Sequence, residues 1–213
     1  DMAIEKTEID KVKVRHRPLN DADLSIIFAN AGEWILYYTV LLHTGLRAGD
    51  AAMLTYDNID FSRSIIKTLV RKSRRIHELP ISDHLITMLK QSKVNGGPLF
   101  PTLYATRKNS QGELIPDERI LHYRISIPRK HLQNILKDAN LPKATLHSFR
   151  VTFNNLLLAE NLAIEDRKSL MAHSSSNTTS VYTHPNLELA REYINKLPTY
   201  SSEKKRDQGV TKV

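Results

Sequence analysis

Residues 146–160 read LHSFRVTFNNLLLAE and carry two patterns, each with the repeat of an α-helix. One face holds the apolar side chains Leu146, Phe149, Phe153 and either Leu156 or Leu157. His147, Arg150 and Asn154 follow spacings of three and four residues along the opposite face. Side chains three or four residues apart share a helix face, so this segment predicts an amphipathic helix that buries one side and presents polar groups on the other.

Helical repeats on both sides of this segment indicate a chain that is mostly α-helical. Asn20 is of a type that caps helices, and Gly45 and residues 95–98, NGGP, are typical of helix ends. From these signals we predict further helices over residues 21–31, 33–44, 51–54, 83–94, 128–139, 164–171 and 186–197.

The pattern changes in the first half of the chain, where residues 64–70 and 76–81 are rich in β-branched side chains. They flank residues 71–75, RKSRR, and together predict a β-hairpin with a basic tip. Residues 99–121 are polar and irregular, and we predict no element there. The expected fold class is mostly α with a small antiparallel β-sheet, an α+β fold.

Length and composition restrict the class of protein. With 213 residues, 40% of them hydrophobic and 25% charged, the chain is typical of one globular domain. It contains no cysteine, which excludes a disulfide scaffold, a thiol nucleophile and a Cys-ligated zinc site, and fits the reducing cytoplasm. The longest apolar run, residues 34–42, is far shorter than the ~20 residues that cross a bilayer, and residues 1–10 show no signal peptide. We therefore expect neither a membrane-embedded nor a secreted protein.

Basic residues outnumber acidic ones by 31 to 23, a net charge of +8, and gather in residues 67–77 and 122–131. Such clusters suit a polyanion, because each cation that neutralises a phosphate releases counterions. A solvated face with ion pairs explains the same clusters equally well. The acidic groups at 116–119 and 165–168 lie in the irregular region and in a predicted first helical turn, where acids are favourable. We predict neither a metal site nor a cofactor.

Several chemically active residue types stand at fixed distances around residues 146–160. In chain order they are Arg47 within T-G-L-R (44–47), Lys72 at the hairpin tip, His147, Arg150, His173 and Tyr182. His173 lies 23 residues after Arg150, and Tyr182 lies nine residues after His173. A single T-G-L-R or H-x-x-R is common by chance, whereas the whole order with these intervals is specific.

This order resembles the tyrosine recombinases, which comprise phage-type integrases and Xer-like site-specific recombinases. The resemblance covers residues 17–197, nearly the whole chain. Three positions depart from the family pattern: Asp50 stands where Glu is usual, Val151 where His is frequent, and Ala172 where Gly is usual. Asp50 keeps the acid one methylene shorter, and the His replaced by Val151 is commonly structural, so we interpret the chain as a divergent member.

The resemblance implies the tyrosine recombinase catalytic-domain fold and site-specific DNA recombination of the integration or excision type. A phosphodiester needs a nucleophile, cations for its charge and a proton donor for the leaving oxygen. Strand cleavage and rejoining would proceed without metal, because arginine side chains would supply the cations. The implied roles are Tyr182 as nucleophile in a 3′-phosphotyrosyl link, Arg47 and Arg150 as clamps on the non-bridging oxygens, Lys72 as general acid, His147 as proton acceptor from the tyrosine, and His173 as hydrogen-bond donor to the phosphate.

Two further assignments follow from the same resemblance. Asp50 is expected to orient the site from behind the phosphate-binding residues. Lys72 competes with its basic neighbours on the hairpin and is favoured by its position. We assign Arg71, Arg74 and Arg75 to contacts with the DNA backbone.

The resemblance also implies how the chain is organised and what it contacts. We expect a linker over residues 1–17, a catalytic domain over 18–198 and a polar, mobile tail over 199–213. The N-terminal core-binding domain of the family is expected to be absent from this chain. The implied partner is double-stranded DNA, bound by a homotetramer on two duplexes whose protomers exchange their C-terminal segments. The implied localisation is the cytoplasm, for a protein encoded by a bacterium, a phage or another mobile element. Two alternatives stay open: a type IB topoisomerase-like relaxing enzyme and a catalytically inactive DNA-binding module.

Overall fold

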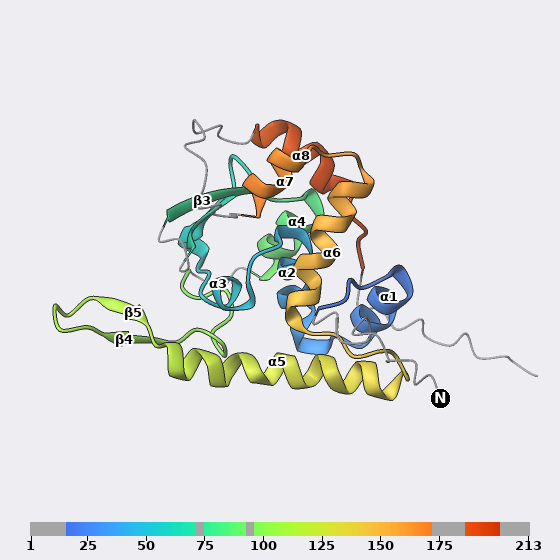
Figure 1. Ribbon diagram of the computed structural model, residues 1–213. Helices are drawn as coiled ribbons and strands as arrows, with labels where there is room; N and C mark the ends of the chain where they lie inside the picture. The colour runs from blue at the N-terminus through green and yellow to red at the C-terminus, as the bar shows by residue number, and fades with distance from the viewer. Residues whose placement is uncertain (1–15, 71–74, 93–95, 172–185, 201–213) are drawn as a thin grey trace, which may run out of the picture.

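The computed structural model describes residues 16–70, 75–92, 96–171 and 186–200 and contains helices packed around α2 (Ile35–Thr44) together with two small antiparallel sheets at the periphery (Figure 1). The α-helices are α1 (Asp21–Ala29), α2 (Ile35–Thr44), α3 (Ala48–Ala52), α4 (Asp83–Ser92), α5 (Glu118–Asp138), α6 (Leu146–Ala159), α7 (Ile164–Leu170) and α8 (Leu187–Asn195). Short 3₁₀ helices are η2 (Gly32–Trp34) and η3 (Tyr56–Asn58), and the strands are β1 (Ile59–Asp60), β2 (Ile65–Val70), β3 (Arg75–Pro80), β4 (Thr106–Lys108) and β5 (Leu114–Pro116). The predicted mostly α fold with a small antiparallel sheet is confirmed.

Helix α2 lies at the centre of the domain and is buried on all sides from Tyr37 to Thr44. The ring of Tyr38 stacks on Phe149 of α6 with ring centroids 5.3 Å apart. Its hydroxyl donates to the carbonyl of Pro128 in α5 at 2.8 Å, so the buried polar group is satisfied. One side chain of α2 therefore connects it to both long helices.

The first sheet has the order β1-β2-β3, and its strands β2 and β3 flank residues 71–74 in the sequence. Ile66 pairs with Leu79, and both are buried, whereas the outer pair of Leu69 and Ile76 is exposed. Helix α3 contacts β2 and α8 contacts β3. The predicted hairpin is confirmed, and β1 adds a third strand that the turn-rich sequence before it did not predict.

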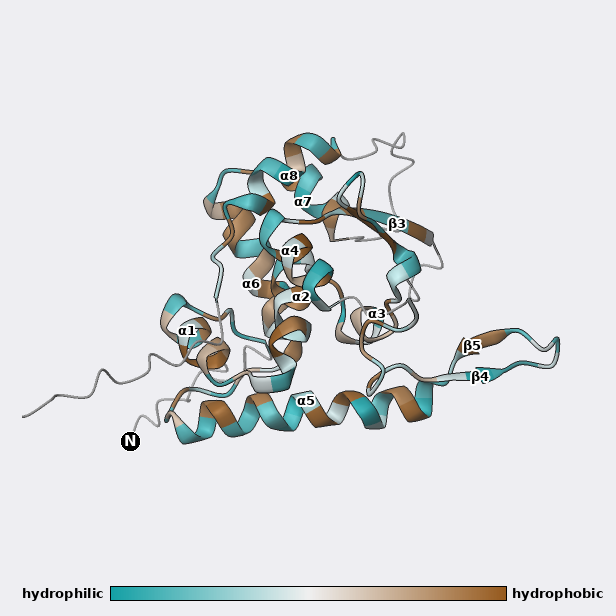
Figure 2. Ribbon diagram, turned by 180° about the vertical axis from the view of Figure 1, so that it is seen from behind, coloured by the Kyte–Doolittle hydropathy of each residue, from teal (hydrophilic) through white to brown (hydrophobic). Residues whose placement is uncertain are grey.

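Helix α5 begins ten residues earlier than predicted, at Glu118 instead of Pro128, and is 21 residues long. Pro128 therefore lies inside the helix, where proline is costly. Asp117 caps the true start by accepting a hydrogen bond from the N–H of Ile120 at 3.0 Å. Figure 2 shows apolar and polar residues alternating along α5, and its buried residues share one face: Leu121, Ile125, Pro128, Leu132, Ile135 and Leu136. Burial along this face outweighs the hydrogen bond that Pro128 removes.

Residues 99–121, for which we predicted no element, contain a second hairpin, and this expectation was wrong. Strands β4 and β5 pair antiparallel and extend away from the body of the domain beside the start of α5 (Figure 1). The side chain of Asn109 holds the turn, because its Oδ1 accepts from the N–H groups of Gln111 and Glu113. Two three-residue strands without a fully buried side chain leave no periodic apolar pattern to detect.

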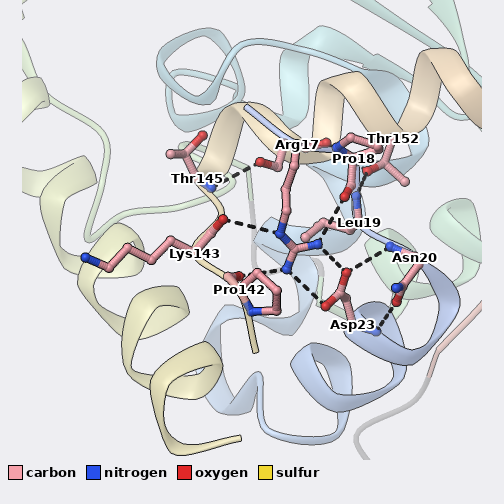
Figure 3. Close-up of polar contacts among 10 residues, drawn as sticks. Arg17, Pro18, Leu19, Asn20, Asp23, Pro142, Lys143, Thr145 and Thr152 are labelled. Atoms are coloured by element: carbon pink, nitrogen blue, oxygen red, sulfur yellow. Dashed lines mark hydrogen bonds and ion pairs between the residues drawn. The ribbon is translucent and has the colours of Figure 1, made fainter. Parts of the chain in front are cut away.

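The segment before α1 is fastened to the start of α6. Arg17 forms a two-point ion pair with Asp23, at 2.5 and 3.0 Å, and also donates to the backbone carbonyls of residues 142–143 (Figure 3). The N–H of Leu19 donates to Oγ1 of Thr152 in α6 at 2.7 Å. The side chain of Arg17, which we predicted as the end of a linker, is thus bound to α1 and to the loop before α6.

Helix α8 packs on its own chain through one apolar face. Ala190 and Ile194 are buried. Arg191 and Asn195 both bind the carboxylate of Asp83 at the start of α4. The N–H of Asp83 in turn donates to Oδ1 of Asn195 at 2.8 Å. We call this set of contacts the α8 socket.

The residues after α8 continue across the same domain. The carbonyl of Pro198 lies 3.2 Å from Nε2 of the buried His43 in α2. Tyr200 stacks on Phe28 of α1, with ring centroids 4.8 Å apart and planes 9° from parallel. Its hydroxyl donates to Asp21 at 2.7 Å.

No single helix in the described parts of the chain has the length and apolar composition that crossing a bilayer requires. Helix α1 and the segment Gly32–Thr44 meet both criteria only as a pair, and they are bent by 119°.

Candidate active site

The loop between α2 and α3 sets the position of Arg47. Gly45 ends α2 in the left-handed conformation, with φ of 61°, and its N–H donates to the carbonyl of Leu41 at 3.1 Å. A Cβ on Gly45 would lie 2.4 Å from Cδ1 of Phe153, so glycine allows the loop to pack directly on α6. Arg47 follows as the residue that precedes α3, and its side chain is 31% exposed.

Arg150 lies in α6 and joins this loop to the end of α7. It is only 4% exposed. One guanidinium nitrogen donates to the carbonyl of Gly45 at 2.5 Å, and the other donates to the carbonyl of Met171. A planar guanidinium can hold two acceptors in a fixed geometry while it keeps further N–H groups for a ligand.

Arg47, Asp50 and Arg150 form one charged group, which we call the arginine cluster. Oδ2 of Asp50 lies 4.0 Å from Nη1 of Arg47, and Asp50 is 3% exposed. Burial and the charge of Arg47 lower the pKa of Arg150 to about 10, and the charge of Asp50 acts in the opposite direction. Arg150 therefore stays protonated at neutral pH, and the cluster presents two cations, one in α6 and one just before α3, together with one acid.

His147 lies one helical turn before Arg150, at the start of α6, and its side chain is exposed. The ring of His16 lies against it, with centroids 4.6 Å apart. Nδ1 of His16 lies 2.9 Å from Oγ1 of Thr145, the residue that caps α6. His147 thus has solvent access and an aromatic neighbour on the segment before α1.

The structure brings together three of the predicted site residues, Arg47 before α3, Asp50 within α3 and Arg150 in α6, and it places His147 one helical turn before Arg150. Asn154, on the same face of α6, accepts a hydrogen bond from Arg167 of α7 at 3.0 Å and so packs helices together. The other predicted residues, Arg71, Lys72, Arg74, His173 and Tyr182, lie outside the described residues. The backbone of Arg75 belongs to β3, opposite Val70.

The model of the phage integrase family matches residues 17–188, which is most of the chain and includes every predicted site residue from Arg47 to Tyr182. The chain belongs to the phage integrase family. It is 25% identical over 190 residues to a probable integrase/recombinase of Acholeplasma phage L2, covering 87% of this chain and 59% of that protein. It is 26% identical over 152 residues to tyrosine recombinase XerD of Pasteurella multocida, covering 68% of this chain and 48% of that protein.

Among solved structures, the integrase from mycobacterium phage Brujita has a similar fold, with a TM-score of 0.63 and 16% identity. The similarity covers 89% of this chain and 61% of that integrase. Our chain thus spans about half the length of the curated relatives it matches. The tyrosine recombinase catalytic-domain fold expected from the sequence is confirmed.

Two residues of this integrase-family site were not predicted from the sequence. His77 of β3 is half-buried, and its Nε2 donates to the carbonyl of Leu170 at the end of α7, at 2.9 Å. His16 contacts His147, as described above. Neither has a signal in the sequence, because their partners lie 93 and 131 residues away and one of them is a backbone carbonyl.

Within the described ranges, no group of three or more His, Cys, Asp or Glu side chains is placed to hold a metal ion.

Proposed function

We propose that this chain catalyses site-specific DNA recombination by cutting and rejoining strands through a 3′-phosphotyrosyl link. The observation that carries the proposal is the arginine cluster, in which two guanidinium groups from α6 and the start of α3 lie beside one buried carboxylate. In a member of the phage integrase family, such a pair suits the two non-bridging oxygens of a phosphodiester.

The proposed step is a transesterification. Oη of Tyr182 attacks the phosphorus, the bond from phosphorus to the 5′ oxygen breaks, and a tyrosine–phosphate bond forms. The tyrosine proton passes to His147, and Lys72 donates a proton to the 5′ oxygen, which leaves as a hydroxyl. The reverse attack by a 5′ hydroxyl restores a phosphodiester, so energy is conserved in the protein–DNA link and no nucleotide cofactor is required.

The arginine cluster would stabilise the charge that develops on the phosphate during this step. Arg150 is already held by the carbonyls of Gly45 and Met171, so little reorganisation is needed when DNA binds. Asp50 forms an ion pair with Arg47. His147 is exposed near the start of α6, one helical turn before Arg150, where it can accept a proton. His173 would add a further hydrogen-bond donor, and Arg71, Arg74 and Arg75 would contact the DNA backbone.

The test is capture of the covalent link. The chain is incubated with a random pool of nicked DNA duplexes, in which the nick lets the cut fragment diffuse away and prevents rejoining. We expect a protein–DNA adduct on a denaturing gel, and sequencing of the trapped DNA reports the recognised site. Digestion and mass spectrometry should place the nucleotide on Tyr182 among the eight tyrosines.

The released strand distinguishes the chemistry further. A free 5′ hydroxyl, labelled by polynucleotide kinase without prior phosphatase treatment, is expected for a 3′ link. An adduct on another tyrosine, or no adduct with any duplex of the pool, would contradict the proposal and leave a DNA-binding module. Relaxation of supercoiled plasmid without strand exchange between two marked duplexes would instead favour the topoisomerase-like activity.

We also infer that the active assembly contains four copies on two DNA duplexes and acts in the cytoplasm. We further infer that the copies exchange α8. The α8 socket supports the exchange, because the same contacts can form between two chains when α8 leaves its own domain. The chain has no cysteine, so the double variant Asp83→Cys with Asn195→Cys reports which chain fills the socket. On the trapped DNA we expect disulfide-linked multimers in a non-reducing gel, whereas only intrachain disulfides would contradict exchange.

A further inference from the structure

Two hydrogen bonds hold consecutive backbone carbonyls at the end of α7. His77 of β3 donates to Leu170, and Arg150 of α6 donates to Met171. Helix α7 has seven residues, and its last carbonyls have no partners within the helix. Its end is therefore fixed by side chains from two other elements, one on the sheet and one in the arginine cluster.

The position of His77 relates this bond to the hairpin. His77 pairs with Thr68 in the register of β2 and β3, and residues 71–74 connect the two strands. Leu170 stands three residues before His173 in the sequence. One hydrogen bond of 2.9 Å thus joins the strand that follows Lys72 to the helix that precedes His173.

We propose that His77 is a positioning residue for DNA strand cleavage: it fixes the end of α7 on β3, so that these two elements keep one relative geometry. This inference rests on the proposed function, which places Lys72 on the hairpin and His173 and Tyr182 after α7. His77 acts through its hydrogen bond to Leu170 and does not contact the phosphate.

The protonation of His77 defines what can replace it. Burial lowers the pKa of His77, the bond to Leu170 raises it, and the charge of Arg150 lowers it, with a net decrease. The imidazole is therefore neutral at pH 7 and carries its hydrogen on Nε2, because a carbonyl can only accept. A neutral side chain with an N–H at the same reach should serve equally well, and glutamine has one.

The test compares His77→Phe, which keeps the ring without the donor, with His77→Gln, which keeps the donor without the ring. Both are measured on the nicked duplexes that the wild-type chain selects from the random pool. At saturating DNA we expect His77→Phe to lower the cleavage rate by about 10- to 100-fold, because small displacements of reacting groups cost rates of this order. DNA affinity should stay within about twofold of wild type, and His77→Gln should restore most of the rate.

Hydrogen exchange of residues 164–171 gives a second measurement that needs no catalysis. His77→Phe should speed amide exchange at the end of α7, and His77→Gln should return it to the wild-type rate. The inference is overturned if His77→Phe cleaves at the wild-type rate, if His77→Gln is as slow as His77→Phe, or if exchange is unchanged. If the wild-type chain forms no adduct, the proposed function fails, and the exchange rates alone then decide whether His77 fixes α7.

Discussion

The Arg150→Ala variant is expected to form the covalent adduct at least about 10³-fold more slowly than the wild-type chain. Loss of one preorganised donor to a developing oxyanion typically costs about 10²- to 10³-fold, and loss of an arginine that stabilises a phosphoryl transition state costs about 10³- to 10⁵-fold. Arg150 combines both roles in the proposed step. Because Arg47 remains, DNA affinity should fall much less than the rate.

The same substitution removes the contacts that Arg150 makes in the folded domain. The carbonyls of Gly45 and Met171 both lose their donor, and a buried polar group left unsatisfied costs about 1–3 kcal/mol. Chemical denaturation should therefore show a lower free energy of unfolding, and the cleavage assay must be run at a temperature where the variant stays folded. Arg150→Lys keeps the charge but not the planar fork, so it should also be slow.

Arg63→Ala is the matched control, because it removes one exposed positive charge away from the arginine cluster. It should cleave at the wild-type rate. If Arg150→Ala, folded and saturated with DNA, cleaves within tenfold of wild type, Arg150 does not bind the reacting phosphate.

Gly45→Ala is expected to lower the free energy of unfolding by about 2–5 kcal/mol. The φ of 61° at Gly45 costs an L-residue about 1–2 kcal/mol, and the new methyl group would meet the ring of Phe153 at 2.4 Å, with an overpacking cost of about 1–3 kcal/mol. Denaturant unfolding measured by circular dichroism checks the value. Gly32→Ala separates the two causes, since Gly32 has a φ of 53° but nothing within 4 Å of a Cβ.

We expect Gly32→Ala to cost only the backbone strain. If Gly45→Ala is no more destabilising than Gly32→Ala, the ring of Phe153 moves without cost, and close packing of the loop on α6 does not require glycine. Because the carbonyl of Gly45 accepts from Arg150, a displaced loop should also slow cleavage.

Local signals explain which elements could be predicted. Asn20 caps α1 and Gly45 ends α2, and each acts within a few residues of itself, so these ends were predicted correctly. The start of α5 was not, because burial of its apolar face in a helix that contacts α1 and α3 outweighs the cost of Pro128 inside the helix. The β4–β5 hairpin depends on polar bonds within its own turn and leaves no apolar pattern.

The candidate site was predictable to the extent that its residues lie in sequence motifs. Arg47 and Arg150 stand in short patterns with a specific order, and the resemblance to tyrosine recombinases placed them in one site before their distance was known. His77 was missed because its partner is a backbone carbonyl on a distant helix. Every residue type carries a backbone carbonyl, so the sequence does not mark this partner. The bonds of Arg150 to Gly45 and Met171 were missed for the same reason.

The contacts of the segment before α1 and of Tyr200 determine the order in which the domain can be completed during synthesis. Helix α1 is the first of the described elements to be synthesised. The partner of Leu19 is synthesised 133 residues later, and the partner of Asp21 is synthesised 179 residues later. On the ribosome, α1 emerges long before either partner exists. The contact of Asp21 with Tyr200 cannot form earlier, so the domain completes its folding only after residue 200 has left the exit tunnel.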